Sequence, residues 1–198
     1  MDTDNTGLAQ IRCIQINLQH SKSATNNLMK VTDTEETDII FAQEPYIYQN
    51  RPVGFGRSYR VFSAGTGKRR TAIIIRNDNI DAILLYKTSD EDTVVLELTY
   101  SNLRLYAICM YFDIKEQIDS NLNKLNGILK ILQGGKALIA ADTNARSKTW
   151  HDHFTNSRGK KVEEFIAASY LHIINEHSAN NTFCNTRGVS NIDLTSQY

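Results

Sequence analysis

The sequence predicts one domain of mixed helix and strand, of the α/β or α+β class, with two packed mixed β-sheets flanked by helices. Three observations lead to this fold class. The length of 198 residues suits a single large domain, and a hydrophobic fraction of 41% is enough for a core. The order of elements mixes hairpins with strand–helix–strand units, which argues against a purely parallel sheet. We expect residues 1–10 to be a flexible N-terminus and the domain to span 11–198.

The first part of the domain is predicted to be strand, helix and strand. Polar and apolar residues alternate roughly from 12 to 18, which predicts a strand that ends near Asn17. A weak apolar face predicts a helix over 24–34. The apolar run over 38–45 has the length of a buried strand and closes with Glu44 and a proline.

The middle of the chain is predicted to be rich in β-structure. The stretch 46–68 contains four glycines and is expected to be mostly loop. A turn at Ser101-Asn102 predicts a hairpin between two of the strands that follow. The predicted strands of this region are 71–76, 80–86, 93–100 and 103–111.

The clearest helix is predicted over 114–132, where apolar residues recur at the spacing of one helical face. Asp113 is expected to cap it together with Glu116, and Gly134-Gly135 is expected to end it. The remaining predicted elements are a buried strand over 136–141, a helix over 160–170, and short strands over 171–174, 182–184 and 191–195.

The composition limits the classes of function. A formal net charge of zero argues against binding by non-specific phosphate attraction alone, but it allows a local basic rim around an acidic site. The three cysteines are widely spaced, so we expect neither a disulfide framework nor a zinc site, and an intracellular location follows. We expect no signal peptide and no membrane span.

Polar residues recur at the ends of predicted strands and in the last alternating segment. They are Asn17, Glu44, Tyr111, Asp142, Asn144 and Asp193. Ligands of α/β sheets gather outside strand ends, and a few oxygen ligands shared with phosphate suit Mg²⁺. A metal beside a phosphate, a carboxylate base for water and amide donors would suffice for phosphodiester hydrolysis.

Each of these residues also has an ordinary structural interpretation. A glutamate before proline is often a solvated strand end, an Asp-x-Asn sequence is often a turn or a helix cap, and a tyrosine is often part of a core. Only the combined order of the residues favours a site. His151 and His153 could bind a metal as a pair, but they lack a partner cluster and are expected to lie in a surface loop.

Two groups of basic residues are candidate DNA contacts. For both groups, contact with a phosphate backbone and a solvated surface remain open alternatives. The residues are Lys68, Arg69 and Arg70 in one run, and Arg146, Lys148 and Arg158 after the Asp142 strand.

The ordered motifs resemble those of the endonuclease/exonuclease/phosphatase superfamily, which includes DNase I. The matching segments are 15–18, 43–46, 106–112, 141–145 and 192–195. Within the superfamily, the sequence is most similar to the endonuclease domains of LINE-type (non-LTR) retrotransposons. The features that favour this subgroup are Gln43-Glu44-Pro45-Tyr46 and Asp142-Thr143-Asn144-Ala145 followed by Ser147 and Trp150-His151. The resemblance implies a DNase I-like, four-layer α+β sandwich.

The same resemblance implies a Mg²⁺-dependent enzyme, with Mn²⁺ as an alternative, that nicks double-stranded DNA to prime reverse transcription. Glu44 would hold the metal, and Asn17 would support the metal–phosphate site. Asp142 would orient or deprotonate the attacking water, whereas Asn144 and Tyr111 would hydrogen-bond the scissile phosphate. A reverse transcriptase domain of the same polyprotein would be a partner, no membrane is expected, and the enzyme would act in the nucleus.

The sequence departs from the family pattern after Asp193, which would orient the catalytic histidine. The closing Ser-Asp-His motif that supplies this histidine does not follow. We therefore expect a C-terminally truncated domain, from a fragment or a decayed copy, with its final strands missing and a hydrophobic edge exposed at 192–195. Two other functions stay open: a catalytically inactive DNA-binding remnant, and a phosphatase acting on phosphoinositides or sphingolipids.

Overall fold

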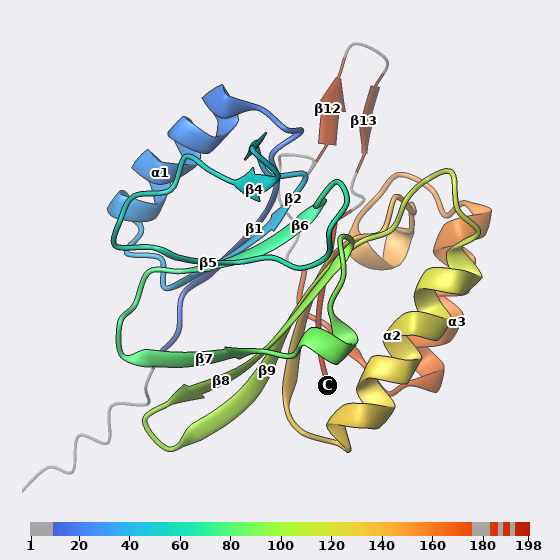
Figure 1. The fold of residues 1–198 in the computed structure, drawn as a ribbon. Helices are drawn as coiled ribbons and strands as arrows, with labels where there is room; N and C mark the ends of the chain where they lie inside the picture. The colour runs from blue at the N-terminus through green and yellow to red at the C-terminus, as the bar shows by residue number, and fades with distance from the viewer. Residues whose placement is uncertain (1–9, 176–182, 186–187, 191–192) are drawn as a thin grey trace, which may run out of the picture.

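The computed structural model describes residues 10–175, 183–185, 188–190 and 193–198. Within these residues, the elements form four layers: one helix, a four-stranded sheet, a six-stranded sheet and a pair of helices (Figure 1). This arrangement confirms the predicted α+β sandwich of two packed mixed sheets flanked by helices.

The four-stranded sheet carries the N-terminal half of the domain. Its strands, in spatial order, are β1 (Cys13–Asn17), β2 (Ile39–Gln43), β6 (Thr71–Ile75) and β5 (Arg60–Phe62). β1 and β2 are parallel because helix α1 (Lys22–Thr34) connects them, whereas the other pairs are antiparallel. The Ser21 side chain caps α1 by accepting a hydrogen bond from the amide of Ala24 at 3.1 Å. Leu28 of α1 packs on the outer face of this sheet.

The six-stranded sheet carries the rest of the β-structure. Its strands, in spatial order, are β11 (His172–Ile173), β14 (Asp193–Gln197), β10 (Ala137–Asp142), β9 (Leu103–Tyr111), β8 (Thr93–Tyr100) and β7 (Ile80–Leu84). Only the β9–β10 pair is parallel among these strands. The expectation that the last segment exposes its edge is wrong, because β14 pairs with β10 on one side and with β11 on the other.

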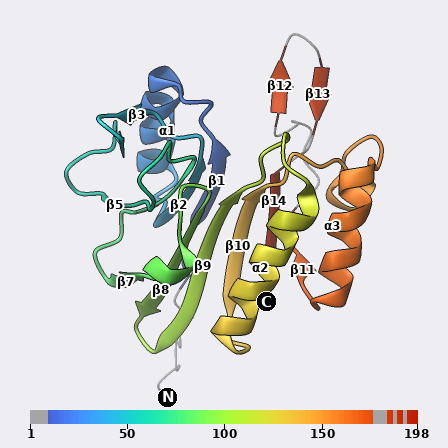
Figure 2. The same ribbon diagram turned by 45° about the vertical axis from the view of Figure 1, so that its right-hand side comes forward.

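Helices α2 (Ile118–Leu132) and α3 (Ser157–Ala168) cover the outer face of the six-stranded sheet side by side (Figure 2). The predicted cap at Asp113 is wrong, because α2 begins later, after Gln117. The Asp113 carboxylate instead accepts a hydrogen bond from the amide of Lys115 and pairs with Arg70. The helix ends as predicted, with Gln133 and Gly134 in the left-handed region at φ values of 50° and 77°.

Smaller elements lie in the connections. The predicted loop 46–68 contains a short hairpin of β3 (Ile47–Tyr48) and β4 (Arg51–Pro52) as well as β5. A second hairpin, of β12 (Phe183–Asn185) and β13 (Gly188–Ser190), stands above the sandwich (Figure 1). Single 3-10 turns occupy Tyr86–Thr88 and Lys148–Trp150. None of the helices in the described part of the chain combines the length and apolar character needed to cross a bilayer.

Three apolar clusters fill the three spaces between the four layers. One lies between α1 and the four-stranded sheet. The second lies between the sheets and contains Phe41, Ile73 and Leu96. The third joins the six-stranded sheet to α2 and α3, with Leu125 and Trp150 among its members. Each fully buried large side chain contributes about 1.5–3 kcal/mol of hydrophobic stabilisation, so these clusters hold the strand ends in fixed positions.

The apolar stripe of α2 gives a direct test of this packing. Leu125 is 4% exposed beneath the helix, whereas Ile131 is 62% exposed on its outer face. We expect Leu125→Ala to lower the free energy of unfolding by about 2–5 kcal/mol, because it leaves a cavity in the core. The matched change Ile131→Ala is expected to alter it by less than about 0.5 kcal/mol. Urea denaturation of both variants measures the difference, and equal losses would contradict the assigned face.

Candidate active site

The predicted site residues lie at one end of the sandwich, where strands of both sheets finish. In the four-stranded sheet, Asn17 is level with Gln43, the residue before Glu44. In the six-stranded sheet, Asp142 is level with Tyr111 on one side and with Asp193 on the other. The two sheets meet at this point, because the Asn17 side-chain amide donates a hydrogen bond of 2.7 Å to Asp142 Oδ2.

Asp142 is the most buried of the predicted catalytic residues, at 1% exposure. Its Oδ2 accepts the hydrogen bond from Asn17, and its Oδ1 accepts one from the amide of Asn144 at 3.1 Å. Burial raises the pKa of Asp142 to about 6, and the nearby negative charge of Glu44 adds to the rise. The two hydrogen bonds and the positive charge of Arg158 act in the opposite direction.

Tyr111 and Asn144 stand beside Asp142. Asn144 has a φ of 47°, a left-handed conformation that asparagine tolerates, and its side-chain amide donates to the Phe112 carbonyl at 3.1 Å. Burial raises the pKa of Tyr111 to about 12, with further contributions from the charges of Glu44 and Asp142. The Tyr111 phenol therefore keeps its proton at neutral pH and is a hydrogen-bond donor.

The backbone of Glu44 leaves the extended conformation of β2, which ends at Gln43. Its φ of 45° is in the left-handed region, and its amide donates to the Arg70 carbonyl at 2.7 Å. The side chain is 22% exposed, so its carboxylate reaches solvent at the strand end. A glutamate in this backbone conformation is uncommon and occurs where surrounding contacts enforce it.

The donor set at this edge fits a hydrated divalent cation. No group of three His, Cys, Asp or Glu side chains gathers into a metal cluster within the described residues. Mg²⁺ keeps several waters and binds through one or two carboxylates plus substrate phosphates, so a single glutamate with an amide oxygen nearby is compatible with it. Glu44 has solvent access at this edge, whereas Asp142 is buried and already accepts two hydrogen bonds, and the Asp113 carboxylate is paired with Arg70.

Arg70, predicted as a DNA contact, is held by carboxylates of the chain itself. Its guanidinium makes two hydrogen bonds of 2.5 Å to Asp92 and a further ion pair with Asp113. Its Cζ lies 5.0 Å from the centre of the Tyr111 ring, a cation–π contact. Both carboxylates raise the pKa of Arg70. Arg70 therefore contacts Tyr111 through its guanidinium, and the Arg70 backbone carbonyl accepts the hydrogen bond from the Glu44 amide.

The other predicted DNA contacts fall into two classes. Arg69, Arg146 and Arg158 are half-buried and bonded within the chain, whereas Lys68 and Lys148 are exposed. The partners are the Gly65 and Asn50 carbonyls for Arg69, Asp152 and the Phe154 ring for Arg146, and the Glu116, Asp113 and Thr143 carbonyls for Arg158. DNA contact by any of these residues stays a prediction.

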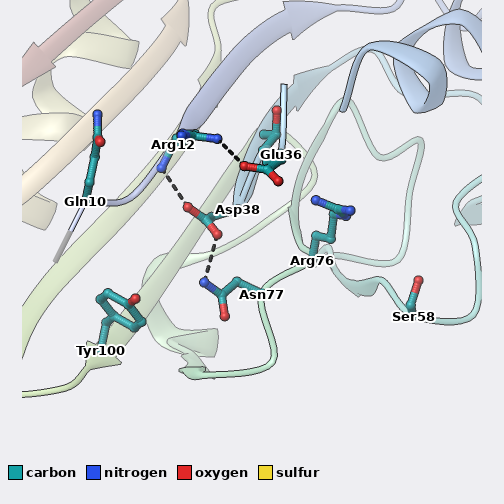
Figure 3. Close-up of a pocket in the computed structure, with 9 residues that line it drawn as sticks. Gln10, Arg12, Glu36, Asp38, Ser58, Arg76, Asn77 and Tyr100 are labelled. Atoms are coloured by element: carbon teal, nitrogen blue, oxygen red, sulfur yellow. Dashed lines mark hydrogen bonds and ion pairs between the residues drawn. The ribbon is translucent and has the colours of Figure 1, made fainter. Parts of the chain in front are cut away.

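A polar pocket opens at the other end of β1 and β2, far along the strands from Asn17 (Figure 3). Its charged groups neutralise one another, because Arg12 pairs with Glu36 at 2.7 Å and Asp38 accepts hydrogen bonds from the Arg12 amide and the Asn77 side chain. A pocket whose polar groups satisfy each other is a poorer candidate for catalysis than the opposite strand ends.

Comparisons with known proteins give relatives of one class. A family model described as "Endonuclease-reverse transcriptase" matches residues 105–197. The chain is 22% identical over 190 residues to a putative 115 kDa protein in the type-1 retrotransposable element R1DM of Drosophila melanogaster. That alignment covers 92% of this chain but only 18% of the relative.

Solved structures extend the comparison to the fold. The endonuclease domain of TRAS1, a telomere-specific non-LTR retrotransposon, matches with a TM-score of 0.83 and 25% identity, over 94% of this chain and 84% of that one. The chain is therefore similar in sequence and in fold to the endonuclease domain of a non-LTR retrotransposon. An AP endonuclease from Leishmania major matches with a TM-score of 0.72 at 12% identity, over 94% of this chain and 78% of that one, and shares the fold.

Sequence reasoning missed one residue at the candidate site. His20 lies in the loop after β1, and its Nε2 is 3.4 Å from Glu44 Oε1. The signal was its place three residues after Asn17, directly beyond a strand end. The predicted pair His151 and His153 is exposed, and His151 contacts the Asn175 carbonyl at 3.3 Å.

The buried carboxyl of Asp142 predicts a pH-dependent stability. The pKa of Asp142 in the folded chain, about 6, lies above its ordinary value of 3.8. The contribution of this carboxyl to the free energy of unfolding is therefore fully present below pH 3.8 and is lost as pH rises through about 6. Between about pH 4 and pH 7, the metal-free chain should lose on the order of 3 kcal/mol relative to Asp142→Asn. Denaturation across this range in a chelator measures the trend. The exposed-residue control Asp81→Asn should show none, and a flat difference for Asp142→Asn would refute the assignment.

Proposed function

We propose that this domain is a Mg²⁺-dependent DNA endonuclease that nicks its target by phosphodiester hydrolysis and leaves a 3′-OH to prime reverse transcription. The observation that carries the proposal is the Asn17–Asp142 hydrogen bond, which joins the two sheets where Glu44, Asn144 and Tyr111 converge. The retrotransposon relatives support a DNA substrate.

Each side chain suits one part of the hydrolysis. Asp142 has a pKa near 6, which suits a general base that accepts a proton from water close to neutral pH. Asn144 and Tyr111 would donate hydrogen bonds to the oxygens of the scissile phosphate. Glu44 would hold Mg²⁺, which when bound would supply positive charge beside those oxygens. Asp193, opposite Asp142 on β14, would orient a catalytic histidine.

The proposed partners are double-stranded DNA and a reverse transcriptase domain of the same polyprotein, with action in the nucleus. The chain spans only 18% and 15% of the lengths of two curated retrotransposon relatives. The Bradysia coprophila relative is a Pol polyprotein, 24% identical over 153 residues, or 72% of this chain. The activities of those longer proteins therefore enter only as part of this proposal.

Substitution of Asp142 is the sharpest test of mechanism. We expect Asp142→Asn to reduce Mg²⁺-dependent nicking of supercoiled plasmid by about 10² to 10⁴-fold, because an amide cannot accept the proton of water. DNA binding should hold, since the change removes a negative charge near phosphate. Glu44→Gln should instead be partly rescued by added Mg²⁺.

The control is Asp81→Asn, which alters an exposed aspartate of β7, a strand that contributes no residue to the candidate site. The assay is run on the 198-residue chain and on a version that includes any further residues its gene encodes. Undiminished nicking by Asp142→Asn would remove Asp142 from the mechanism. Binding without nicking in every form would favour an inactive DNA-binding remnant.

The exposed lysines predict the salt dependence of DNA binding. Lys68 lies on the loop between β5 and β6, and Lys148 lies in the connection after β10. Both are exposed, and neither side chain makes a hydrogen bond or ion pair with the residues that the structure describes. If both contact phosphate, their joint replacement by alanine should reduce the slope of log K against log salt by about 2. Lys130, exposed near the far end of α2, provides the control. Fluorescence anisotropy at several salt concentrations gives the slopes, and an unchanged slope for the double variant would exclude these contacts.

A further inference from the structure

His20 is fixed against the segment that carries Glu44. Its backbone has a φ of 54°, and its amide donates to the Glu44 carbonyl at 2.7 Å. Its ring Nδ1 lies 3.0 Å from the carbonyl oxygen of Pro45. The ring and the backbone of His20 are therefore both tied to residues 44–45, so the imidazole and the Glu44 carboxylate keep a defined relation to each other.

The Pro45 contact determines which ring nitrogen carries the proton. A carbonyl oxygen can only accept, so Nδ1 is the donor and the lone pair of Nε2 points away from it. Histidines that bind metals commonly donate their other ring nitrogen to a backbone carbonyl in this way, which fixes the tautomer and the orientation of the ring.

Nε2 of His20 is buried and has no hydrogen-bond partner among the described residues. The nearest charged atom is Glu44 Oε1 at 3.4 Å, and no hydrogen bond joins the two. With Nδ1 donating to Pro45, an unprotonated Nε2 presents its lone pair to the carboxylate, so the contact requires a positive charge at Nε2, supplied by a proton or by a bound metal ion. A buried acceptor aimed at a carboxylate is the environment that a cation would satisfy.

The spacing of the two atoms suits a shared metal ion. In the octahedral geometry of Mg²⁺ and Mn²⁺, metal–donor bonds of about 2.1 Å that meet at about 90° place two neighbouring donor atoms about 3.0 Å apart, close to the separation in this structure. The observed separation of Nε2 and Oε1 is 3.4 Å. We propose that His20 Nε2 and Glu44 Oε1 together bind the divalent cation, and that the nitrogen ligand makes the site prefer Mn²⁺ to Mg²⁺.

The preference follows from the chemistry of the donors. Mg²⁺ is a hard cation that takes oxygen ligands and gives up its water reluctantly. First-row transition ions accept imidazole nitrogen more readily. In this proposal, which rests on the proposed metal-dependent function, water and phosphate supply the remaining ligands. Asn17 and Asp142 stay outside the metal pair and keep their hydrogen bond to each other.

The test is a measurement of Mn²⁺ bound to the 198-residue chain. Electron spin echo envelope modulation detects a ¹⁴N nucleus bound directly to Mn²⁺. We expect this modulation in the wild type, and we expect ¹⁵N-histidine labelling to change its frequency without any substitution. His20→Gln should abolish the modulation and weaken Mn²⁺ binding by about 10-fold or more. Mg²⁺ binding, measured by competition, should change less, so the selectivity ratio should fall.

His172→Gln is the matched control, since His172 is exposed on β11 in the other sheet. Circular dichroism confirms that each variant folds. Absence of nitrogen modulation in the wild type, or its persistence in His20→Gln, overturns the assignment of His20. These results are separable from the proposed function: Mg²⁺-dependent nicking without nitrogen modulation defeats only the His20 proposal. Failure of the chain to nick while nitrogen modulation is present defeats only the proposed nuclease.

Discussion

The polar bridge between the two sheets is the constraint on which the rest of the site depends. Gln43 is fully buried among apolar residues, and its side-chain amide donates to the Ala140 carbonyl at 3.2 Å and to Cys109 Sγ at 3.4 Å. Asn17, which is level with Gln43 at the end of the β1–β2 ladder, donates to Asp142 of the other sheet. Apolar packing alone tolerates sliding between two sheets, whereas buried polar groups demand their partners. The bridge therefore sets the register of one sheet against the other.

The same packing explains the raised pKa of Asp142, which suits its proposed role as a general base. The sheets bury its carboxyl, which raises its pKa, and two hydrogen bonds limit that rise. A solvated aspartate would be too weak a base, and an uncompensated buried one would be protonated at neutral pH. Burial of a carboxylate lowers the free energy of unfolding. Buried groups with strongly shifted pKa values cluster at functional sites. The position of the Asp142 carboxyl, its raised pKa and its cost in stability thus have one cause, the packing of the two sheets against the end of β10.

The sequence was informative where a pattern is local. The strands over 93–100 and 103–111 were predicted with the bounds that the structure has, because the turn at Ser101-Asn102 separates them. The order of strand-end residues likewise predicted the members of the candidate site. The start of α2 was wrong because Asp113 is captured by Arg70, which lies 43 residues away in sequence. No local pattern reports a contact of that range.

Arg70 and His20 show why charge and residue type alone could not complete the site. A basic run suggests a phosphate contact, yet its last residue, Arg70, is paired with Asp92 and Asp113 and contacts the Tyr111 ring instead. His20 lacks the neighbours of a catalytic triad in sequence, but the left-handed turns at His20 and Glu44 bring the two side chains together. Both turns depend on hydrogen bonds between loops from different strands. The contact between His20 and Glu44 is therefore decided by loop conformation, which no local sequence pattern reports.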